Sequence, residues 1–435
     1  MMDTEIPQTA IDYIQSLGRF SGAPGLHRIY ALCAALGDPQ DGLRFVHIAG
    51  TNGKGSTACM IASALQAAGY RVGLYTSPYL IRFHERIRVD GLTIPDADLN
   101  RLAERVAVAC ESLSLPEGES VGAFEFTTAL AFLYFAEQAC DLVVLETGLG
   151  GRCDATNVVK TTEVSVITPI SRDHTAVLGD TVAEIAREKA AIIKPASAVV
   201  CADGQPEEAR EVVRRACEAC GAIWYSGTRE YHLLRCGIDG SAFVYEGQGY
   251  TLAMPGRHQL QNAMTALRSL SALRERGWEI PTEAAVRGLA RARMQGRLER
   301  LSEQPLILLD GAHNAAGISA LCRAVDEMLK MRRLHVVMGM VRDKEYEVCV
   351  REIARRADVF YACAPEADDR AVNEHTIAAL AEQSCSEVYD CRTAEQALGL
   401  ALRSAGQQDC ILVCGSLYLI GEAEKILRSR QKTAE

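Results

Sequence analysis

Short apolar runs alternate with longer amphipathic stretches along most of the chain. The apolar runs are rich in β-branched residues, which favours strands. We predict strands at residues 44–49, 71–75, 142–146, 164–168, 198–201 and 222–225. Between them, helical periodicity predicts helices at residues 55–68, 97–113, 125–138, 181–190 and 207–219. Such alternation is typical of an α/β fold with a mostly parallel sheet that helices cover on both faces.

The pattern changes at residues 230–253, where short alternating segments are separated by glycines. These segments predict a small antiparallel flap. Helices are then expected at residues 259–274 and 282–292.

A second α/β series begins after Arg297 and predicts a second, smaller Rossmann-like domain. Its strands are expected at residues 305–309, 334–338, 358–362, 386–389 and 410–414. Its helices are expected at residues 315–330, 345–356, 371–383, 393–403 and 420–430. The segment between the two series is polar. We therefore predict a P-loop domain of residues 1–294, flap included, and a C-terminal α/β domain of residues 297–435.

Composition narrows the class of protein. The chain has 435 residues, 48% hydrophobic and 23% charged, as expected for a globular protein of more than one domain. Its net charge of −10 argues against nucleic acid as a partner. No apolar run is long enough to cross a bilayer, and the N-terminus lacks the basic and apolar regions of a signal peptide. We therefore predict a cytoplasmic protein with no membrane partner.

The 16 cysteines are interpreted as reduced thiols, because secreted disulfide frameworks are normally short chains. Several, such as Cys59, Cys322 and Cys414, lie in apolar company, where a thiol packs as a small hydrophobe. Cys217 and Cys220 form a CxxC motif, but no second pair with zinc-ligand spacing accompanies it. A metal or redox site there has little support.

The most informative motif is FVHIAGTNGKGS at residues 45–56. An apolar strand breaks into a glycine-rich loop, and an apolar helical pattern follows. Glycines let backbone amides turn around an anion, and Lys54 supplies a mobile charge for phosphates. A standard P-loop has Ser or Thr directly after the lysine, whereas Gly55 intervenes here. The alternative is an ordinary glycine-rich turn, but the flanking strand and helix favour a nucleoside triphosphate site.

A second motif, VVLETGLGGRCDATN, occupies residues 143–157. A buried strand ends at Glu146, and an acidic residue at that tip of a parallel strand is where a P-loop enzyme holds Mg²⁺. The alternative is an ordinary strand-end carboxylate. Asp154 and Asn157 fit equally well as turn formers.

Two further candidates lie between residues 167 and 194. Asp173 and His174 follow a predicted strand, at the same sheet edge as Lys54 and Glu146, which favours a ligand or catalytic role for the histidine. Lys189 lies on an otherwise apolar helical stretch. It is either a snorkelling lysine or a buried one that is open to modification or metal bridging.

The second domain has its own polar strand ends. Its first strand leads into Asp310, His313 and Asn314, and its last leads into Ser416 and Tyr418. Asn314 also fits as a helix cap. Polar groups grouped at one edge favour a binding site.

Together these segments resemble folylpolyglutamate synthase and dihydrofolate synthase, members of the Mur ligase superfamily. The most specific motifs are HIAGTNGKGST (47–57) and ETGLGGRCDATN (146–157). The others are PGLHRIYALCAALGDPQ (24–40), YTSPYLIRFHERIRVDG (75–91), FEFTTALAF (124–132), DHTAVLGDTVAEIAREKAAIIK (173–194), GRHQLQNAMTAL (256–267), GRLE (296–299), DGAHN (310–314) and GSLYLIGE (415–422). The resemblance covers nearly the whole chain.

The resemblance implies an ATP-dependent ligase that adds L-glutamate to a folate γ-carboxylate through an acyl phosphate, and in some members also to dihydropteroate. It implies catalytic roles for Lys54, Glu146, His174, Lys189 and His313. The implied ATP site comprises Thr51, Asn52, Gly53, Lys54, Gly55, Ser56, Asn262, Arg297 and Asp310. The implied Mg²⁺ ligands are Ser77, Glu146, His174 and a carbamylated Lys189. The implied substrate residues are Leu26, His27, Phe124, Glu125, Cys153, Asp154, His313 and Ser416.

The family also implies a monomer and a possible monovalent cation. This chain departs from the family pattern at Tyr79, Arg172, Ala191 and Ala315. None of these changes removes an implied ligand, but the positive charge of Arg172 lies beside the implied metal site.

Two other functions are compatible with a P-loop. One is a Mur ligase that acts on a UDP-linked peptide, which we expect to need about 100 residues of uridine-nucleotide domain before the ligase core, and the sequence starts with that core. The other is a non-catalytic ATP-binding switch, which needs neither Glu146 nor His174.

Overall fold

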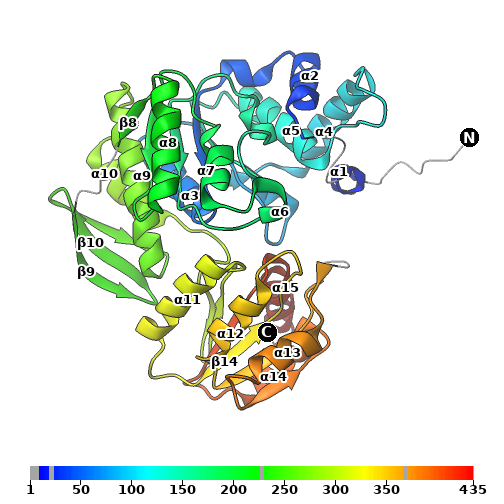
Figure 1. The fold of residues 1–435 in the computed structure, drawn as a ribbon, viewed down its shortest axis with the longest axis vertical. Coiled ribbons are helices and arrows are strands. Elements are labelled where there is room, and N and C mark those ends of the chain that lie inside the picture. Colours follow the sequence, from blue (N-terminus) through cyan, green and yellow to red (C-terminus); the bar gives the residue numbers. More distant parts are fainter. Residues whose placement is uncertain (1–8, 19–23, 226–229, 367–369, 435) are drawn as a thin grey trace, which may run out of the picture. The chain divides into compact units, whose positions relative to one another are not determined.

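The structure is a computed structural model that describes residues 9–18, 24–225, 230–366 and 370–434. The chain forms two compact units, which are described separately (Figure 1). The first comprises Met1–Thr228 and Asn262–Arg291, and the second comprises Arg229–Gln261 and Ala292–Glu435. The antiparallel flap thus belongs to the second unit, whereas the predicted boundary at residue 294 places it in the first.

An eight-stranded sheet forms the centre of the first unit, in the order β4-β3-β2-β5-β1-β6-β7-β8. Six strands run parallel, namely β1 (Phe45–Ala49), β2 (Val72–Tyr75), β5 (Leu142–Glu146), β6 (Val164–Ile167), β7 (Ala198–Cys201) and β8 (Ile223–Tyr225). These match the six predicted strands. Strands β3 (Ile87–Val89) and β4 (Leu92–Thr93) extend one edge in antiparallel fashion and are too short for a periodic signal.

Helices surround this sheet. They are α1 (Ala10–Ser16), α2 (His27–Ala35), α3 (Lys54–Ala67), α4 (Asp96–Glu111), α5 (Ala123–Glu137), α6 (Thr175–Leu178), α7 (Val182–Ala190), α8 (Glu207–Ala219), α9 (Arg257–Glu275) and α10 (Thr282–Arg291). Short 3₁₀ turns lie at Pro39–Gly42, Phe83–Arg86 and Ala155–Val158. Helices α1, α2 and α6 were not predicted, and α1 and α6 have only seven and four residues.

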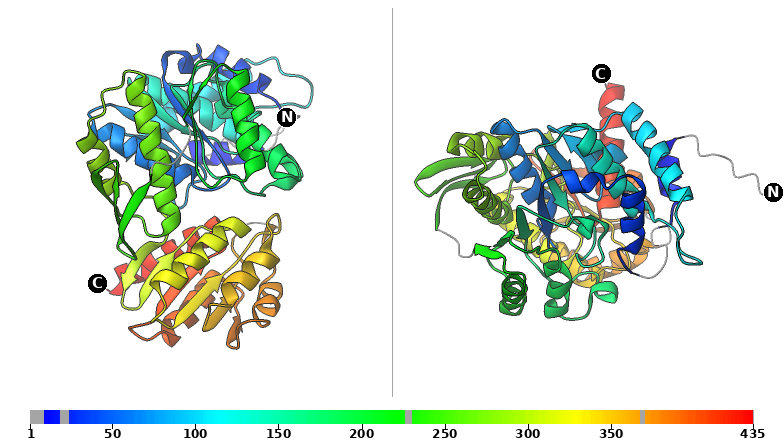
Figure 2. Two further views of the ribbon diagram at one scale, coloured as in Figure 1. Left: turned by 60° about the vertical axis from the view of Figure 1, so that its left-hand side comes forward. Right: turned by 90° about the horizontal axis from the view of Figure 1, so that it is seen from above.

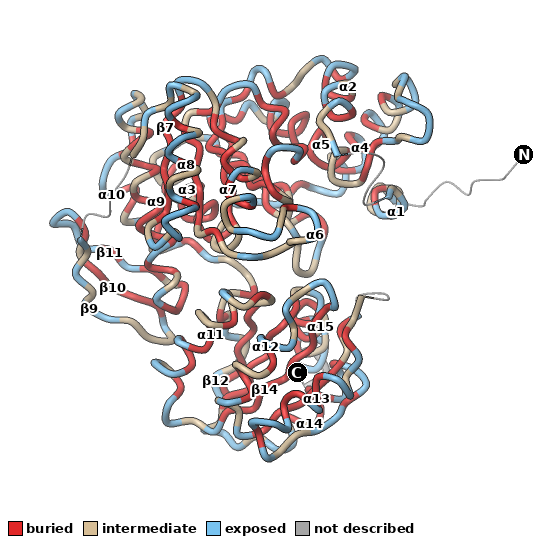
Figure 3. The backbone as a smooth tube through the Cα atoms, viewed as in Figure 1, coloured by how far each residue is buried: buried red, intermediate tan, exposed pale blue. Residues whose placement is uncertain are grey.

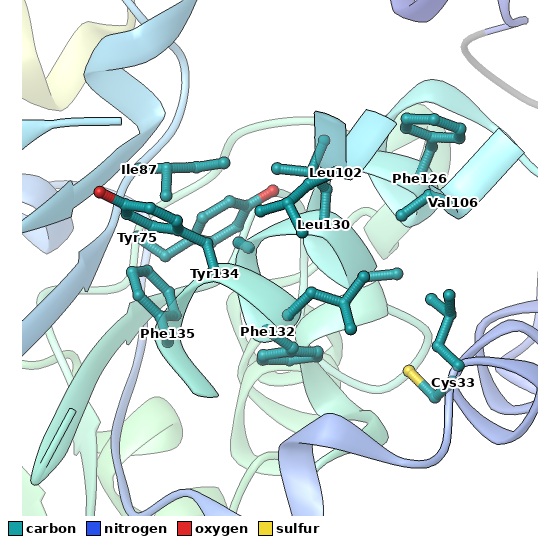
Figure 4. Close-up of a cluster of buried hydrophobic side chains, with 14 of the residues drawn as sticks. Cys33, Tyr75, Ile87, Leu102, Val106, Phe126, Leu130, Phe132, Tyr134 and Phe135 are labelled. Carbon is teal, nitrogen blue, oxygen red and sulfur yellow. The ribbon is translucent and has the colours of Figure 1, made fainter. Parts of the chain in front are cut away.

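Helix α5 lies inside the first unit rather than on its surface. Every residue from Phe126 to Phe135 is buried, which explains why the helix has no polar stripe (Figures 3 and 4). Phe132 meets Phe45 of β1 edge to face, with ring centroids 5.7 Å apart. Such pairs stabilise beyond the area they bury. The core therefore fixes the strand that leads into the P-loop.

Helix α3, which follows the P-loop, is held by α10. A Cβ atom added to Gly288 of α10 would lie 2.3 Å from the Cα atom of Ala64. The Ser63 hydroxyl also donates a 2.8 Å hydrogen bond to the Gly288 carbonyl. Only glycine permits two helix backbones to approach this closely.

The second unit contains a six-stranded sheet in the order β12-β13-β17-β14-β15-β16. Its strands are β12 (Glu299–Glu303), β13 (Leu306–Leu309), β14 (Leu334–Met338), β15 (Val359–Ala362), β16 (Val388–Asp390) and β17 (Cys410–Cys414). Only the edge strand β12, which was not predicted, runs antiparallel to its neighbour. A separate antiparallel sheet of β9 (Tyr231–Gly237), β10 (Gly240–Tyr245) and β11 (Gln248–Leu252) is the predicted flap.

The helices of the second unit form two groups around its larger sheet (Figure 2). One group comprises α11 (Ala315–Met328), α12 (Tyr346–Ala354) and α13 (Glu374–Ala381), and the other comprises α14 (Ala394–Ser404) and α15 (Leu417–Ala434). Helix α15 begins three residues before the predicted start at 420. The predicted α/β class, with a parallel P-loop sheet, a flap and a second α/β unit, is confirmed.

All 16 cysteines lie in the described ranges as free thiols, and Cys59, Cys322 and Cys414 are buried as expected. The thiols of Cys217 and Cys220 donate to separate carbonyls, those of Ala222 and Ile193. Within the described ranges, no helix has the length and apolar character needed to span a membrane.

Candidate active site

Four neighbouring strands of the first sheet end at one edge. Strands β2, β5, β1 and β6 are parallel, so their C-terminal ends lie side by side. Ser77 follows β2, Glu146 ends β5, the P-loop follows β1 and His174 follows β6. The topology therefore gathers these predicted residues at the edge where α/β sheets bind ligands.

The P-loop turns sharply into helix α3. Gly53 caps the helix with φ at 83°, and the helix begins at Lys54. The amides of Thr51 and Asn52 donate to the Pro169 carbonyl, at 2.9 and 3.2 Å, so they serve the neighbouring loop. The first-turn amides of a helix, here those of Gly55 and Ser56, have no intrahelical acceptor, so they can bind an anion.

Lys54 lies close to this helix start. Its side chain is half-buried, and its Nζ atom donates to the Thr51 carbonyl at 3.4 Å. The bond is long and the amine has three donors, so the ammonium can reach a phosphate without losing a strong partner.

Asn262 of helix α9 lies against the same loop. A Cβ atom on Gly53 would come within 2.3 Å of the Asn262 Oδ1 atom, and Asn262 is buried. The two residues are more than 200 positions apart, so only the fold brings them together. This places an amide side chain beside the loop, and contact of Asn262 with a nucleotide stays a prediction.

Glu146 and Ser77 meet across the gap between β5 and β2. The Glu146 side chain is buried at the end of its strand, and its Oε2 atom accepts the Ser77 amide at 3.1 Å. A buried carboxylate requires such partners. A carboxylate and a serine hydroxyl are hard oxygen ligands, which suit Mg²⁺.

His174 has an uncommon backbone conformation. Its φ is 52°, and its amide donates to the Asp173 carboxylate at 2.8 Å. Its Nε2 atom lies 3.8 Å from the same carboxylate, and about a third of the side chain is exposed. A left-handed non-glycine residue is costly and tends to occur at functional sites. Arg172, one of the four departures from the family pattern, is exposed.

Lys189 is buried rather than snorkelling, with 4% of its surface exposed. Its Nζ atom donates a 2.9 Å hydrogen bond to the Gly50 carbonyl, at the start of the P-loop. This hydrogen bond connects helix α7 to the P-loop. The interpretation of Lys189 as a solvent-seeking lysine is excluded by this geometry.

The glycine-rich turn after Glu146 packs tightly. A Cβ atom on Gly148 would lie 2.5 Å from the Phe124 ring, and one on Gly151 would lie 2.6 Å from the Glu188 carbonyl. Asp154 closes the turn, since its Oδ2 atom accepts the Leu149 amide at 2.8 Å. Burial raises the pKa of this carboxyl.

Asp154 therefore acts as a turn former, one of the two interpretations of the sequence. Asn157 does so too, because its amide donates to the carbonyls of Arg152 and Ala191. Substrate contact by Asp154 stays a prediction, as does contact by Cys153, whose side chain is exposed.

A buried arginine organises the predicted acceptor side. Arg28 of helix α2 donates to Glu119 and to Glu125, both at 3.1 Å. His27 pairs with the same Glu119, and this hydrogen bond lowers the pKa of the carboxyl. Sequence reasoning missed Arg28 and Glu119, because nothing local links residues about 90 positions apart. Leu26, at the start of α2, is half-buried.

In the second unit, three predicted residues meet at the end of β13. Asp310 accepts the amides of Leu298 and Ala312, each at 2.9 Å. A Cβ atom on Gly311 would lie 2.5 Å from the Arg297 Nη1 atom. The His313 Nδ1 atom lies 2.8 Å from the Gly311 carbonyl, and because a carbonyl only accepts, Nδ1 carries a proton and donates this hydrogen bond.

Strand β17 pairs with β13, and its end supplies Ser416. The serine is buried, and its Oγ atom accepts the Tyr418 amide at 3.2 Å. Asn314 caps helix α11 through the Gly317 amide at 2.8 Å, as the capping interpretation expects. The second unit thus has its own polar edge, of His313, Ser416, Asp310 and Arg297.

Comparison with known families gives two matches. The description "Mur ligase middle domain" matches residues 48–270, and "Mur ligase, glutamate ligase domain" matches residues 296–417.

Individual proteins match over nearly the whole length. The dihydrofolate synthase/folylpolyglutamate synthase of Bacillus subtilis is 36% identical, over 97% of this chain and 99% of its own. The folylpolyglutamate synthase of Lacticaseibacillus casei is 34% identical, over 96% and 97%. A solved structure of E. coli FolC in complex with DHPP and ADP has a TM-score of 0.84 at 30% identity and covers 97% of both chains.

Proposed function

The chain belongs to the folylpolyglutamate synthase and dihydrofolate synthase family of Mur ligases, and we propose that it uses ATP to join L-glutamate to the γ-carboxylate of a folate. As a member of this family the chain is an ATP-dependent ligase. The observation that carries the proposal is the pairing of Ile48 with Glu146 across β1 and β5, which sets a buried carboxylate beside the phosphate loop. A non-catalytic ATP switch does not need this carboxylate.

The reaction needs an activated carboxylate, because oxide is a poor leaving group. An oxygen of the folate carboxylate attacks the γ-phosphorus of ATP, and ADP leaves. The glutamate amine then attacks the acyl phosphate carbon, inorganic phosphate leaves, and the amine loses a proton. In the proposal, Lys54 and the first-turn amides of α3, at Gly55 and Ser56, hold the phosphates as charge spreads over them.

The residues at this edge fit a magnesium ion. Glu146 supplies a carboxylate, Ser77 a hydroxyl and His174 an imidazole, and the backbone amide of Ser77 already donates a hydrogen bond to the Glu146 carboxylate. When bound, Mg²⁺ neutralises phosphate charge during transfer. The monovalent cation implied by the family resemblance stays a prediction.

We also propose that Lys189 is carbamylated. Its Nζ atom donates to the Gly50 carbonyl, and a carbamate nitrogen keeps one N–H for that bond. Carbamylation converts a buried cation into an anion beside the metal ligands. Lys189→Ala should lose activity and regain part of it with acetate or formate, whereas Lys160→Ala, at an exposed lysine, should remain active. Absence of rescue, with the fold intact, would contradict the carbamate.

From the family resemblance we assign Arg297 and Asp310 of the second unit to nucleotide binding, and on the same ground we assign Asn262 of the first unit. The paired strand ends that hold His313 and Ser416 are assigned to L-glutamate and the γ-phosphate. The remaining acceptor residues, Leu26, His27, Phe124, Glu125, Cys153 and Asp154, are assigned to the pterin side.

A coupled ADP-release assay tests the function. ADP should appear only when ATP, L-glutamate and an acceptor are all present, and the arms compare tetrahydrofolate, dihydropteroate and a UDP-muramoyl peptide. Turnover with tetrahydrofolate supports folate ligation, and turnover with dihydropteroate adds dihydrofolate synthesis. ADP release that ignores both acceptor and glutamate, or that needs the UDP-linked acceptor, overturns the proposal. We propose a cytoplasmic monomer that acts on small molecules alone.

A further inference from the structure

A buried histidine lies directly before the phosphate loop. His47 is the central residue of β1 and is fully buried. Its Nε2 atom lies 2.8 Å from the Thr156 hydroxyl, and that hydroxyl donates to Asp154 Oδ1 at 2.5 Å. A hydrogen-bonded chain thus runs from the P-loop strand to the turn that follows Glu146.

The donor and acceptor of each hydrogen bond in this series follow from the number of protons available. A hydroxyl carries one proton, and Thr156 gives it to Asp154, so the Thr156 oxygen accepts from His47. His47 is therefore the Nε2–H tautomer. Among the described residues its Nδ1 atom has no hydrogen-bond partner, as expected for a nitrogen that carries no proton. Burial, with a smaller contribution from Lys194, lowers the pKa of His47 to about 3, so the ring stays neutral.

Asp154, the last residue in this series of hydrogen bonds, holds a turn that lies between two candidate metal ligands. Asp154 binds the Leu149 amide with its second oxygen, at 2.8 Å. The turn begins at Glu146, and a Cβ atom on Gly151 would lie 3.0 Å from the Lys189 carbonyl. The turn therefore connects Glu146, at the end of β5, to helix α7, which carries Lys189.

We propose that His47 is a positioning residue that acts through Thr156 and Asp154 to hold the turn of residues 147–154 between Glu146 and Lys189. His47 touches no reacting group in this scheme. The inference rests on the proposed function for its activity readout alone, because the tautomer of His47 can be observed directly.

The first test observes His47 in the wild-type protein. ¹⁵N-labelled histidine spectra at neutral pH, with the His47 signal assigned by its loss in His47→Gln, should show a neutral ring protonated at Nε2. Thr156→Val should shift this signal. An Nδ1–H ring or an imidazolium in the wild-type protein would overturn the proposal whether or not the chain ligates folate, and this measurement does not depend on a variant's activity.

The second test separates positioning from general stability. Thr156→Val should raise the half-saturating Mg²⁺ concentration for ADP release by about tenfold, the typical worth of a buried hydrogen bond to a charged group. The KM for glutamate should change little, and Thr156→Ser, which keeps the hydroxyl, should restore the Mg²⁺ dependence. Thr162→Val removes another buried hydroxyl, which contacts Ser165, and serves as the control. An unchanged Mg²⁺ dependence in folded Thr156→Val, or an equal change in Thr162→Val, would overturn the proposal.

Discussion

The backbone amide of Ser77 donates a 3.1 Å hydrogen bond to the buried carboxylate of Glu146. The two residues end neighbouring parallel strands, so the bond joins two loops at one edge of the sheet. It orients the carboxylate through its Oε2 atom and does not use the Ser77 hydroxyl. Because the bond uses a backbone donor, the Ser77 side chain can be changed without removing it.

Glu146→Gln should show whether the negative charge of Glu146, rather than its shape, is needed to bind Mg²⁺. Glutamine keeps an oxygen that can accept the Ser77 amide, but it loses the negative charge that attracts Mg²⁺. We expect the half-saturating Mg²⁺ concentration to rise by about tenfold or more, with little change in circular dichroism. Glu218→Gln, at an exposed glutamate of helix α8, is the matched control. Equal Mg²⁺ dependence in Glu146→Gln and the wild-type protein would remove Glu146 from the metal site.

Lys54→Ala should abolish phosphoryl transfer without unfolding the protein. The only hydrogen bond described for its ammonium is the long one to the Thr51 carbonyl, so little stability is lost. Loss of one preorganised cation should lower kcat by about 10²–10³. Stopped ADP-release assays and thermal denaturation measure the two effects. Lys160→Ala should behave as wild type in both, and undiminished turnover in Lys54→Ala would exclude the phosphate role.

His47 should make the protein sensitive to acid. Its pKa is about 3 in the folded protein, because of burial, against 6.5 when exposed. Between these values the unfolded chain binds a proton that the folded protein does not. The contribution of His47 to the free energy of unfolding is therefore fully present above pH 6.5 and is lost as the pH is lowered. The contribution is about 1.4 kcal/mol per pH unit in that window.

Urea denaturation at several values between pH 4.5 and 7.5 measures this contribution. The stability of His47→Gln should depend on pH less steeply than that of the wild-type protein, by about one proton. If the free energy of unfolding depended equally on pH in the two proteins, His47 would be protonated, or accessible to protons, in the folded state.

Gly288→Ala should destabilise the first unit. The added methyl group would meet the backbone of Ala64, which cannot move without shifting helix α3. Overpacking of this kind costs about 1–3 kcal/mol and should lower Tm by several degrees. Gly42→Ala, where a Cβ atom meets nothing within 4 Å, should leave Tm nearly unchanged. A Gly288→Ala protein as stable as the control would show that the two helices can separate at little cost.

The order of strands and helices could be predicted because its signals are local. The signals are the period of the hydrophobic residues, the glycine at position 53 and the change from strand to helix around Lys54. Each of them can be recognised within a few residues. For the same reason the sequence alone pointed to a phosphate site. Strands β3, β4 and β12 escaped prediction, since two of them are very short and β12 is a partly exposed edge strand with little apolar alternation.

Partners far apart in the chain were decided only by the tertiary structure. Arg28 has many acidic residues to choose from, and the fold selects Glu119 and Glu125. The sequence is compatible with either a snorkelling or a buried Lys189, and the hydrogen bond from Lys189 to the Gly50 carbonyl shows that it is buried. His47 carried no sequence signal, because its role depends on a hydroxyl 109 positions away. Sequence determines what each segment prefers locally, whereas contact between distant side chains exists only once burial has brought their segments together.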